Sequence, residues 1–198
     1  MKKRAAWKTN KAAWLARGRT RRIIAKVLTT PMDSPAIAKA AARFVPKIER
    51  VQTSRVLRQL SSRGIVECLT PKIRGGRIYC LTRGGRRIIA SVFGAKRQSI
   101  PKGIDWYVYS RVYRNRVMRR ILDYLKNVRH KGPQEVGQVR HLLFTDRILS
   151  YTQLYRSLDY LAACWLVKYC GSSLLNGHRL YLITEAGRRV AEVLARER

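Results

Sequence analysis

The chain repeats its own pattern roughly 100 residues later, and this duplication limits the fold more than any other feature of the sequence. The segment Leu81–Arg87 (LTRGGRR) returns as Ile183–Arg189 (ITEAGRR), at an offset of 102 residues. The triplet Arg-Arg-Ile at residues 21–23 returns at residues 119–121, at an offset of 98 residues. Because the matches keep their order along the chain, we expect two tandem domains of one fold, related by internal duplication.

The boundary between the two copies is expected at residues 96–103, where Gly, Pro, Ser and Lys interrupt the apolar pattern. Copy one then spans residues 1–95 and opens with a basic N-terminal helix or arm. Copy two spans residues 104–198 and opens with an aromatic helix.

Both opening helices carry aromatic side chains spaced by two helical turns. Trp7 and Trp14 are seven residues apart, and Trp106 and Tyr113 repeat this spacing in copy two. We expect the two tryptophans of copy one to pack rather than to stack on unpaired bases. We expect the stripe of Trp106, Tyr109 and Tyr113 to contact the other domain, a second chain in a homodimer, or a protein partner.

Apolar spacing in copy one predicts three helices, a two-stranded hairpin and a final helix. The expected ranges, in order, are 21–28, 35–44, 50–62, 65–70, 77–81 and 83–93. Ser34 is the expected N-cap of the second helix, with Pro35 in the first helical position. Gly64 is expected to end the third helix in a left-handed conformation, and Thr82 to cap the last helix.

The third helix of copy one is expected to bury a stripe of apolar side chains. This stripe is Val51, Val56, Leu57 and Leu60. Copy two repeats the order of elements, and its expected ranges are 117–128, 133–144, 151–163, 166–169, 179–183 and 185–196. The expected fold class is therefore mainly α with small β-hairpins, an α+β arrangement.

This order of elements resembles the winged helix-turn-helix family, especially the small regulators of the MarR and PadR type. The resemblance lies in residues 63–66 (RGIV), the hairpin, and residues 81–86 (LTRGGR). In copy two it lies in residues 165–167 (WLV) and 183–188 (ITEAGR). It implies two tandem winged-helix domains whose third helices enter a major groove and whose hairpins, the wings, reach the phosphates.

The charge points to a polyanionic partner. The 198 residues include 43 Lys and Arg but only 11 Asp and Glu, a formal net charge of +32. Residues 1–98 hold 25 basic and three acidic side chains, whereas residues 99–198 hold 18 and eight. A fold this basic repels itself unless an anion neutralises it. We expect copy one to supply most of the electrostatic affinity.

The candidate binding residues lie on the third helix and the wing of each copy, because Arg and Gln can bond to base edges and basic side chains to phosphates. In copy one they are Arg50, Gln52, Arg55, Arg58, Gln59, Lys72, Arg74 and Arg77. In copy two they are Thr152, Gln153, Arg156, His178 and Arg179. Asp159 on the third helix of copy two would repel a phosphate, so this copy is expected to be the weaker binder.

Other classes of function find little support in the sequence. No carboxylate pair, nucleophile–base pair or phosphate-binding loop is apparent, so we expect neither an enzyme nor a cofactor. The four cysteines lack metal-ligand spacing, so we expect no metal site. Cys68 and Cys80 could face each other across the hairpin as a redox pair. No apolar run suits a membrane span, and we expect an intracellular protein, either cytoplasmic and nucleoid-associated or nuclear.

The sequence therefore predicts a nucleic-acid-binding protein, with double-stranded DNA as the favoured target and a modest sequence preference. It would act as a chromatin-like protein or a transcription regulator. Two alternatives stay open at this point. One is an RNA-binding, ribosome-associated protein, and the other is a tandem winged-helix scaffold in transcription or replication machinery.

Overall fold

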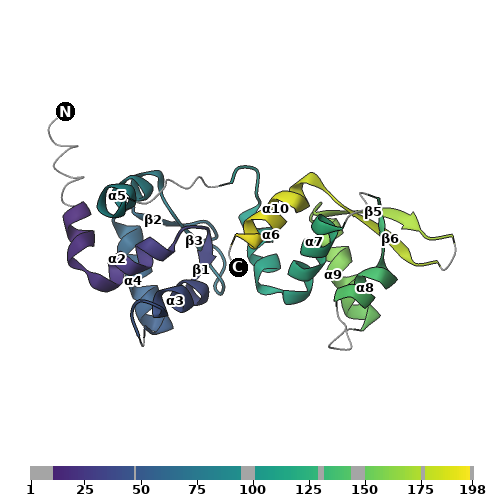
Figure 1. The fold of residues 1–198 in the computed structure, drawn as a ribbon, viewed down its shortest axis with the longest axis horizontal. Helices are drawn as coiled ribbons and strands as arrows, with labels where there is room; N and C mark the ends of the chain where they lie inside the picture. Colours follow the sequence, from purple (N-terminus) through teal and green to yellow (C-terminus); the bar gives the residue numbers. More distant parts are fainter. Residues whose placement is uncertain are drawn as a thin grey trace. The chain divides into compact units, whose positions relative to one another are not determined.

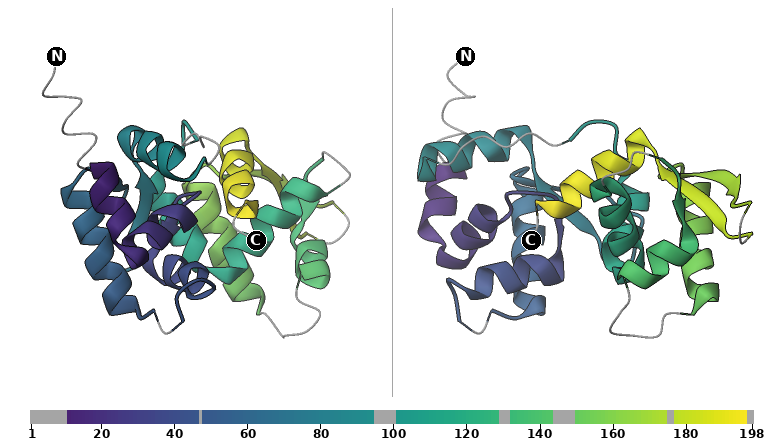
Figure 2. Two further views of the ribbon diagram at one scale, coloured as in Figure 1. Left: turned by 60° about the vertical axis from the view of Figure 1, so that its left-hand side comes forward. Right: turned by 45° about the vertical axis from the view of Figure 1, so that its right-hand side comes forward.

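The computed structural model describes residues 11–46, 48–94, 101–128, 132–143, 150–174 and 177–196. The chain divides into two compact units, Met1–Ile100 (unit 1) and Pro101–Arg198 (unit 2). It is mainly helical, with one small antiparallel sheet in each unit (Figures 1 and 2). Trp7, the first part of the expected basic arm and most of the expected linker 96–103 lie outside the described residues.

The two units share one order of elements and one sheet topology. In unit 1 a helix over residues 11–17 precedes α2 (Arg19–Val27), β1 (Met32–Asp33), α3 (Ser34–Ala42), α4 (Arg50–Ser62), β2 (Val66–Cys68), β3 (Ile78–Leu81) and α5 (Arg83–Phe93). Unit 2 contains α6 (Trp106–Arg114), α7 (Arg116–Asn127), β4 (Gln134–Glu135), α8 (Val136–Leu143), α9 (Tyr151–Ala163), β5 (Val167–Ser172), β6 (Arg179–Ile183) and α10 (Glu185–Ala195). The strand orders are β1-β3-β2 and β4-β6-β5.

Each sheet contains a short third strand that the sequence did not indicate. In unit 1, Met32 of β1 pairs with Tyr79 of β3. In unit 2, Gln134 of β4 pairs with Tyr181 of β6. Two residues are too short to produce an alternating pattern, so only the tertiary fold reveals these strands. Residues 134–135, expected at the start of a helix, belong to β4 instead.

Three helices of unit 1, α2, α3 and α4, pack together around one core. The fully buried side chains of this core include Ile24, Ile37, Leu57 and Leu60. Trp14 packs against the same core, and the guanidinium groups of Arg21 and Arg63 lie 4.0 and 4.2 Å from the centre of its ring. The expectation that Trp14 packs is therefore confirmed, and the two cations cover its ring.

Two local expectations for unit 1 were wrong. The N-cap of α3 is Asp33 rather than Ser34, since the Ala36 N–H donates to Asp33 Oδ1 at 2.9 Å. Ser34 is the first helical residue, and its hydroxyl lies 3.1 Å from that of Ser54 on α4.

On α4, Val51 was expected in the core but is 76% exposed, whereas Thr53 is fully buried in its place. Val51 precedes Val56 by five residues, which places it on the far side of the helix.

A hydrogen-bonded corner joins the end of α4 to the start of α5. Thr82 N–H donates to the Ile65 carbonyl at 3.0 Å, and its hydroxyl donates to the Gly64 carbonyl at 2.7 Å. The same hydroxyl accepts the Gly85 N–H at 2.8 Å, so Thr82 caps α5 as expected. Gly85 lies so close to the Ile65 carbonyl oxygen that a β-carbon would collide with it. We call this arrangement of Thr82, Gly85 and Ile65 the threonine–glycine corner.

Unit 2 builds the same corner from Thr184, Gly187 and Leu166. Thr184 N–H donates to the Leu166 carbonyl at 3.1 Å, and Gly187 N–H donates to the Thr184 hydroxyl at 3.1 Å. One residue differs. Gly64 has φ +65°, as expected for a left-handed helix end, but Trp165 occupies the matching position with φ +57°. Trp165 is also 80% exposed, so it gains little packing in return for a strained backbone.

The corner predicts opposite effects for two adjacent glycines of α5. Gly85→Ala should lower the free energy of unfolding by about 1–3 kcal/mol, because its β-carbon meets the Ile65 carbonyl. Gly84→Ala is the matched control and should raise it by about 0.5–1 kcal/mol, because alanine favours the helix and its β-carbon has room. Chemical denaturation of both variants measures the difference. Equal stabilities would show that the close approach at Gly85 does not restrict the fold.

The strained tryptophan predicts a stabilising substitution. Trp165→Gly should raise the free energy of unfolding by about 0.5–1 kcal/mol, because relief of the left-handed strain outweighs the extra entropy of glycine in the unfolded chain. Gly64→Ala should shift stability the opposite way in unit 1. Thermal and denaturant unfolding report both changes. A loss of stability in Trp165→Gly would mean that the indole makes a structural contact despite its exposure.

Candidate nucleic-acid interface

The solvent-facing side of α4 carries the helix residues that the sequence singled out in copy one. Because Thr53, Val56, Leu57 and Leu60 face the core, the opposite side of the helix faces solvent. That solvent-facing side, here called the α4 face, exposes Arg50, Val51, Gln52, Arg55, Arg58, Gln59 and Ser62. The structure thus brings the five expected helix residues onto the exposed part of one element.

Val51 is the residue of the α4 face that sequence reasoning missed. Val51, Arg55, Arg58 and Ser62 follow the spacing i, i+4, i+7 and i+11, so they form the central row of this face. That spacing was readable in the sequence and could have identified Val51 as exposed. An apolar side chain in a basic row can contact a thymine methyl group, whereas arginine bonds to guanine edges and to phosphates.

The hairpin of unit 1 carries the expected wing residues on the loop between β2 and β3. Thr70 is fully buried, and its hydroxyl accepts the Ile78 N–H at 2.9 Å, which ties the loop to the sheet. Lys72, Arg74 and Arg77 are exposed. Arg77 folds back on its own loop, because its Nε donates to the Ile73 carbonyl at 2.8 Å. Among the described residues, none of these three basic side chains forms an ion pair with an acid.

The corresponding side of α9 in unit 2 has a different chemistry. Thr152, Gln153 and Arg156 are exposed there, as expected. The central row is Thr152, Arg156, Asp159 and Ala163, so an acid replaces the second arginine of the α4 face. The β5–β6 hairpin that accompanies α9 extends beyond the helices of unit 2 (Figure 1).

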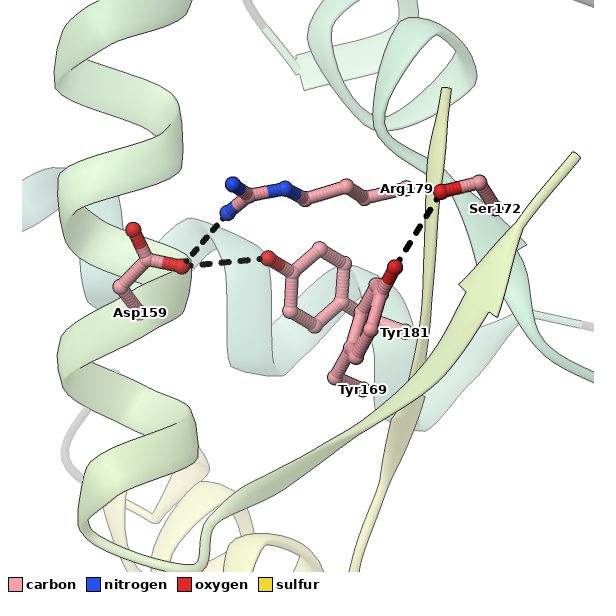
Figure 3. A network of polar contacts seen from close by, with 5 residues as sticks. All are labelled: Asp159, Tyr169, Ser172, Arg179 and Tyr181. Atoms are coloured by element: carbon pink, nitrogen blue, oxygen red, sulfur yellow. Dashed lines mark hydrogen bonds and ion pairs between the residues drawn. The ribbon is translucent and has the colours of Figure 1, made fainter. Parts of the chain in front are cut away.

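Asp159 is held by two side chains of β6. Arg179 Nη1 and the Tyr181 hydroxyl both donate to Asp159 Oδ1, at 3.1 and 3.3 Å (Figure 3). Burial raises the pKa of the Tyr181 phenol, so its hydroxyl keeps the proton that it donates. The Tyr169 hydroxyl lies 3.1 Å from the Ser172 hydroxyl on β5, a contact that Figure 3 also draws. Arg179, the first residue of β6, is therefore already paired with an acid that the protein itself supplies.

Aromatic rings lie next to this network. The rings of Tyr151 and Tyr155 on α9 are stacked with centres 6.2 Å apart, and Tyr151 and His178 are stacked with centres 6.0 Å apart and planes 11° apart. Arg140 of α8 lies 4.3 Å from the centre of the Tyr151 ring, and Arg179 lies 5.1 Å from that of Tyr155. We call these five residues the aromatic array. Sequence reasoning had singled out only His178 and Arg179 of them as binding residues.

The aromatic helix α6 offers less contact surface than expected. Tyr109 is fully buried, with its ring 5.3 Å from that of Trp106 and 5.8 Å from that of Tyr113. Trp106 and Tyr113 are half-buried. Tyr109 is thus unavailable to a partner, because its side chain is already enclosed. Partner binding through Trp106 and Tyr113 stays a prediction.

The suggested redox pair of Cys68 and Cys80 was wrong. Cys68 is paired with Tyr79 across the hairpin, and Cys80 is paired with Glu67. Neighbouring residues of a strand point to opposite faces, so the two thiols do not face each other. The Cys80 thiol lies 3.3 Å from Glu67 Oε1, and burial, with the Glu67 carboxylate, raises the pKa of the Cys80 thiol above its usual range. These surroundings therefore disfavour the thiolate, which is the reactive form of a cysteine.

Within the described ranges, no group of three or more His, Cys, Asp or Glu side chains could hold a metal ion. No helix in the described part of the chain is long and apolar enough to cross a membrane. Comparisons with protein-family models, curated proteins and solved structures found no match.

The Asp159 network predicts a small effect on stability. Asp159→Asn keeps an oxygen that can accept from Arg179 and Tyr181 but removes the charge. Both charged side chains are about half exposed, so the free energy of unfolding should change by less than about 1 kcal/mol. Denaturant unfolding at low and high salt measures it. A loss of several kcal/mol would contradict this view and would make the ion pair a main support of unit 2.

Proposed function

We propose that both units are winged helix-turn-helix modules and that unit 1 binds double-stranded DNA. In this proposal the α4 face lies in the major groove, and the loop between β2 and β3 is the wing that contacts phosphates. The target is a duplex with modest sequence preference, because the arginines of the face can bind phosphates as well as base edges, and phosphate contacts carry no sequence information.

The observation that carries the proposal is the half-exposed carboxylate of Asp159 in unit 2. Asp159 occupies a position where a wing arginine and a strand tyrosine both donate to one carboxylate oxygen. At the matching positions of unit 1 stand Arg58, Arg77 and Tyr79. Arg77 and Tyr79 are donors of the same kind as Arg179 and Tyr181. The helix of unit 1, however, has the donor Arg58 where α9 has the acid Asp159. A DNA phosphate can supply the oxygen that Asp159 supplies in unit 2.

The charge of unit 1 supports the same conclusion. Arg50, Arg55, Arg58, Lys72 and Arg74 are exposed, and within the described residues none of them is neutralised by an ion pair. Residues 1–98 contain only three acids, of which Asp33 is a buried helix cap. Phosphate contacts give an affinity that depends on salt and little on sequence. Unit 1 is therefore suited to bind along a duplex at many positions.

The proposal predicts a specific loss of affinity. Arg58→Ala combined with Arg77→Ala should weaken duplex binding at least tenfold and lower the slope of log affinity against log salt by about 2, roughly one per phosphate contact. Fluorescence anisotropy with a labelled duplex over a range of salt concentrations measures both. The matched control is Arg83→Ala combined with Arg87→Ala, which removes the same charge from exposed positions on α5.

The control should leave affinity and salt slope much closer to those of the parent protein. Equal losses in the two double variants would show that only net charge matters, and the assigned face would be wrong. A flat salt response in the parent protein would reject nucleic-acid binding altogether. Stronger competition by a structured RNA than by the same length of duplex DNA would reassign the target to RNA.

A further inference from the structure

We propose that the aromatic array of unit 2 binds unpaired nucleotides, whose bases stack on its rings and guanidinium groups. This inference rests on the proposed function of unit 1 and adds a second type of target. The preferred ligand of the whole chain is then a duplex with an adjoining single strand, with the duplex on unit 1 and the unpaired bases on unit 2.

The first support comes from the residues exchanged between the two copies. Tyr151 stands where unit 1 has Arg50, and Tyr155 stands where it has Ser54. His178 stands where it has Gly76. An arginine, a serine and a glycine of unit 1 are thus replaced in unit 2 by three residues with aromatic rings, at matching positions of the helix and the hairpin. The exchange changes the ligand chemistry while the threonine–glycine corner and the sheet stay the same.

The second support is the geometry of the rings. Planes that meet at 28° for Tyr151 and Tyr155, and at 11° for Tyr151 and His178, form a nearly parallel series. Tyr151 remains 38% exposed and Tyr155 and His178 are half-buried, so the series lies at the surface rather than in the core. Bases stack on such rings, and also on the flat guanidinium groups of arginine.

The third support is that this surface is poorly suited to a duplex. Asp159 lies in the central row of α9, where a carboxylate repels the phosphates that border a groove. It also engages Arg179 at 3.1 Å, the residue that matches the wing arginine of unit 1. A single strand can present its bases to the rings and keep its phosphates turned toward Arg156, which is exposed. Stacking on a ring is possible for every base, so we expect the array to bind unpaired bases without a strong sequence preference.

The experiment compares three labelled ligands on the full chain. They are a blunt duplex, the same duplex with a short oligothymidine overhang, and the oligothymidine alone. The parent protein should bind the overhang ligand about tenfold more tightly than the blunt duplex, the usual contribution of a stacked base or two. Tyr151→Ala combined with Tyr155→Ala should remove this preference and leave blunt-duplex affinity unchanged.

Two controls separate stacking from other causes. Tyr151→Phe combined with Tyr155→Phe keeps the rings and should keep the preference. Tyr107→Ala removes a tyrosine of α6 that is 40% exposed and lies outside the array, and it should also keep the preference. Thermal unfolding of every variant checks that unit 2 remains folded.

The outcomes distinguish this inference from the proposed function. Normal duplex binding without an overhang preference would overturn the inference and leave unit 1 as proposed. An overhang preference that survives the double alanine variant would place the site elsewhere. Failure to bind any of the three ligands would reject both. Loss of the preference in the alanine variant alone, with the phenylalanine variant unaffected, would establish the array as a base-stacking site.

Discussion

The threonine–glycine corner is the constraint on which both units depend. One threonine bonds to the backbone at the end of the third helix and caps the last helix, while a glycine lets the two segments approach to backbone contact. The end of the third helix and the start of the last helix are therefore held together at one point. Because the corner recurs at Thr184 and Gly187, the two units hold their third helices and hairpins in the same relation.

A scaffold held in this way can change its surface without changing its fold. The α4 face and the matching side of α9 belong to the same helix of the repeated fold. The α4 face exposes three arginines and no acid, whereas the side of α9 pairs an acid with an arginine beside stacked rings. In unit 2 the Asp159 carboxylate of α9 accepts hydrogen bonds from Arg179 and Tyr181 of the hairpin. The proposals for the two units differ because unit 2 has the acid Asp159 at this position, whereas unit 1 has Arg58.

Much of the architecture could be predicted from the residues alone. The third helices, Arg50–Ser62 and Tyr151–Ala163, have the predicted bounds, because their apolar spacing and end signals agree. The N-cap of α3 is Asp33 and not the predicted Ser34. Either side chain can cap a helix, and only the folded backbone decides which of them does so. Val51 was assigned to the core because it is apolar, although its spacing placed it with the arginines. The two-residue strands left no pattern to detect.

The sequence by itself determined the duplication, the order of the elements, the excess of positive charge and its bias toward the first half. These properties depend on residue type and local spacing, which are written in the chain. Only the tertiary structure decided that Arg179 and Tyr181 converge on Asp159 and that Arg140, Tyr151 and His178 lie together. Such contacts join residues that are far apart in the chain, and a side chain's partner follows from packing and strand register rather than from its neighbours in sequence.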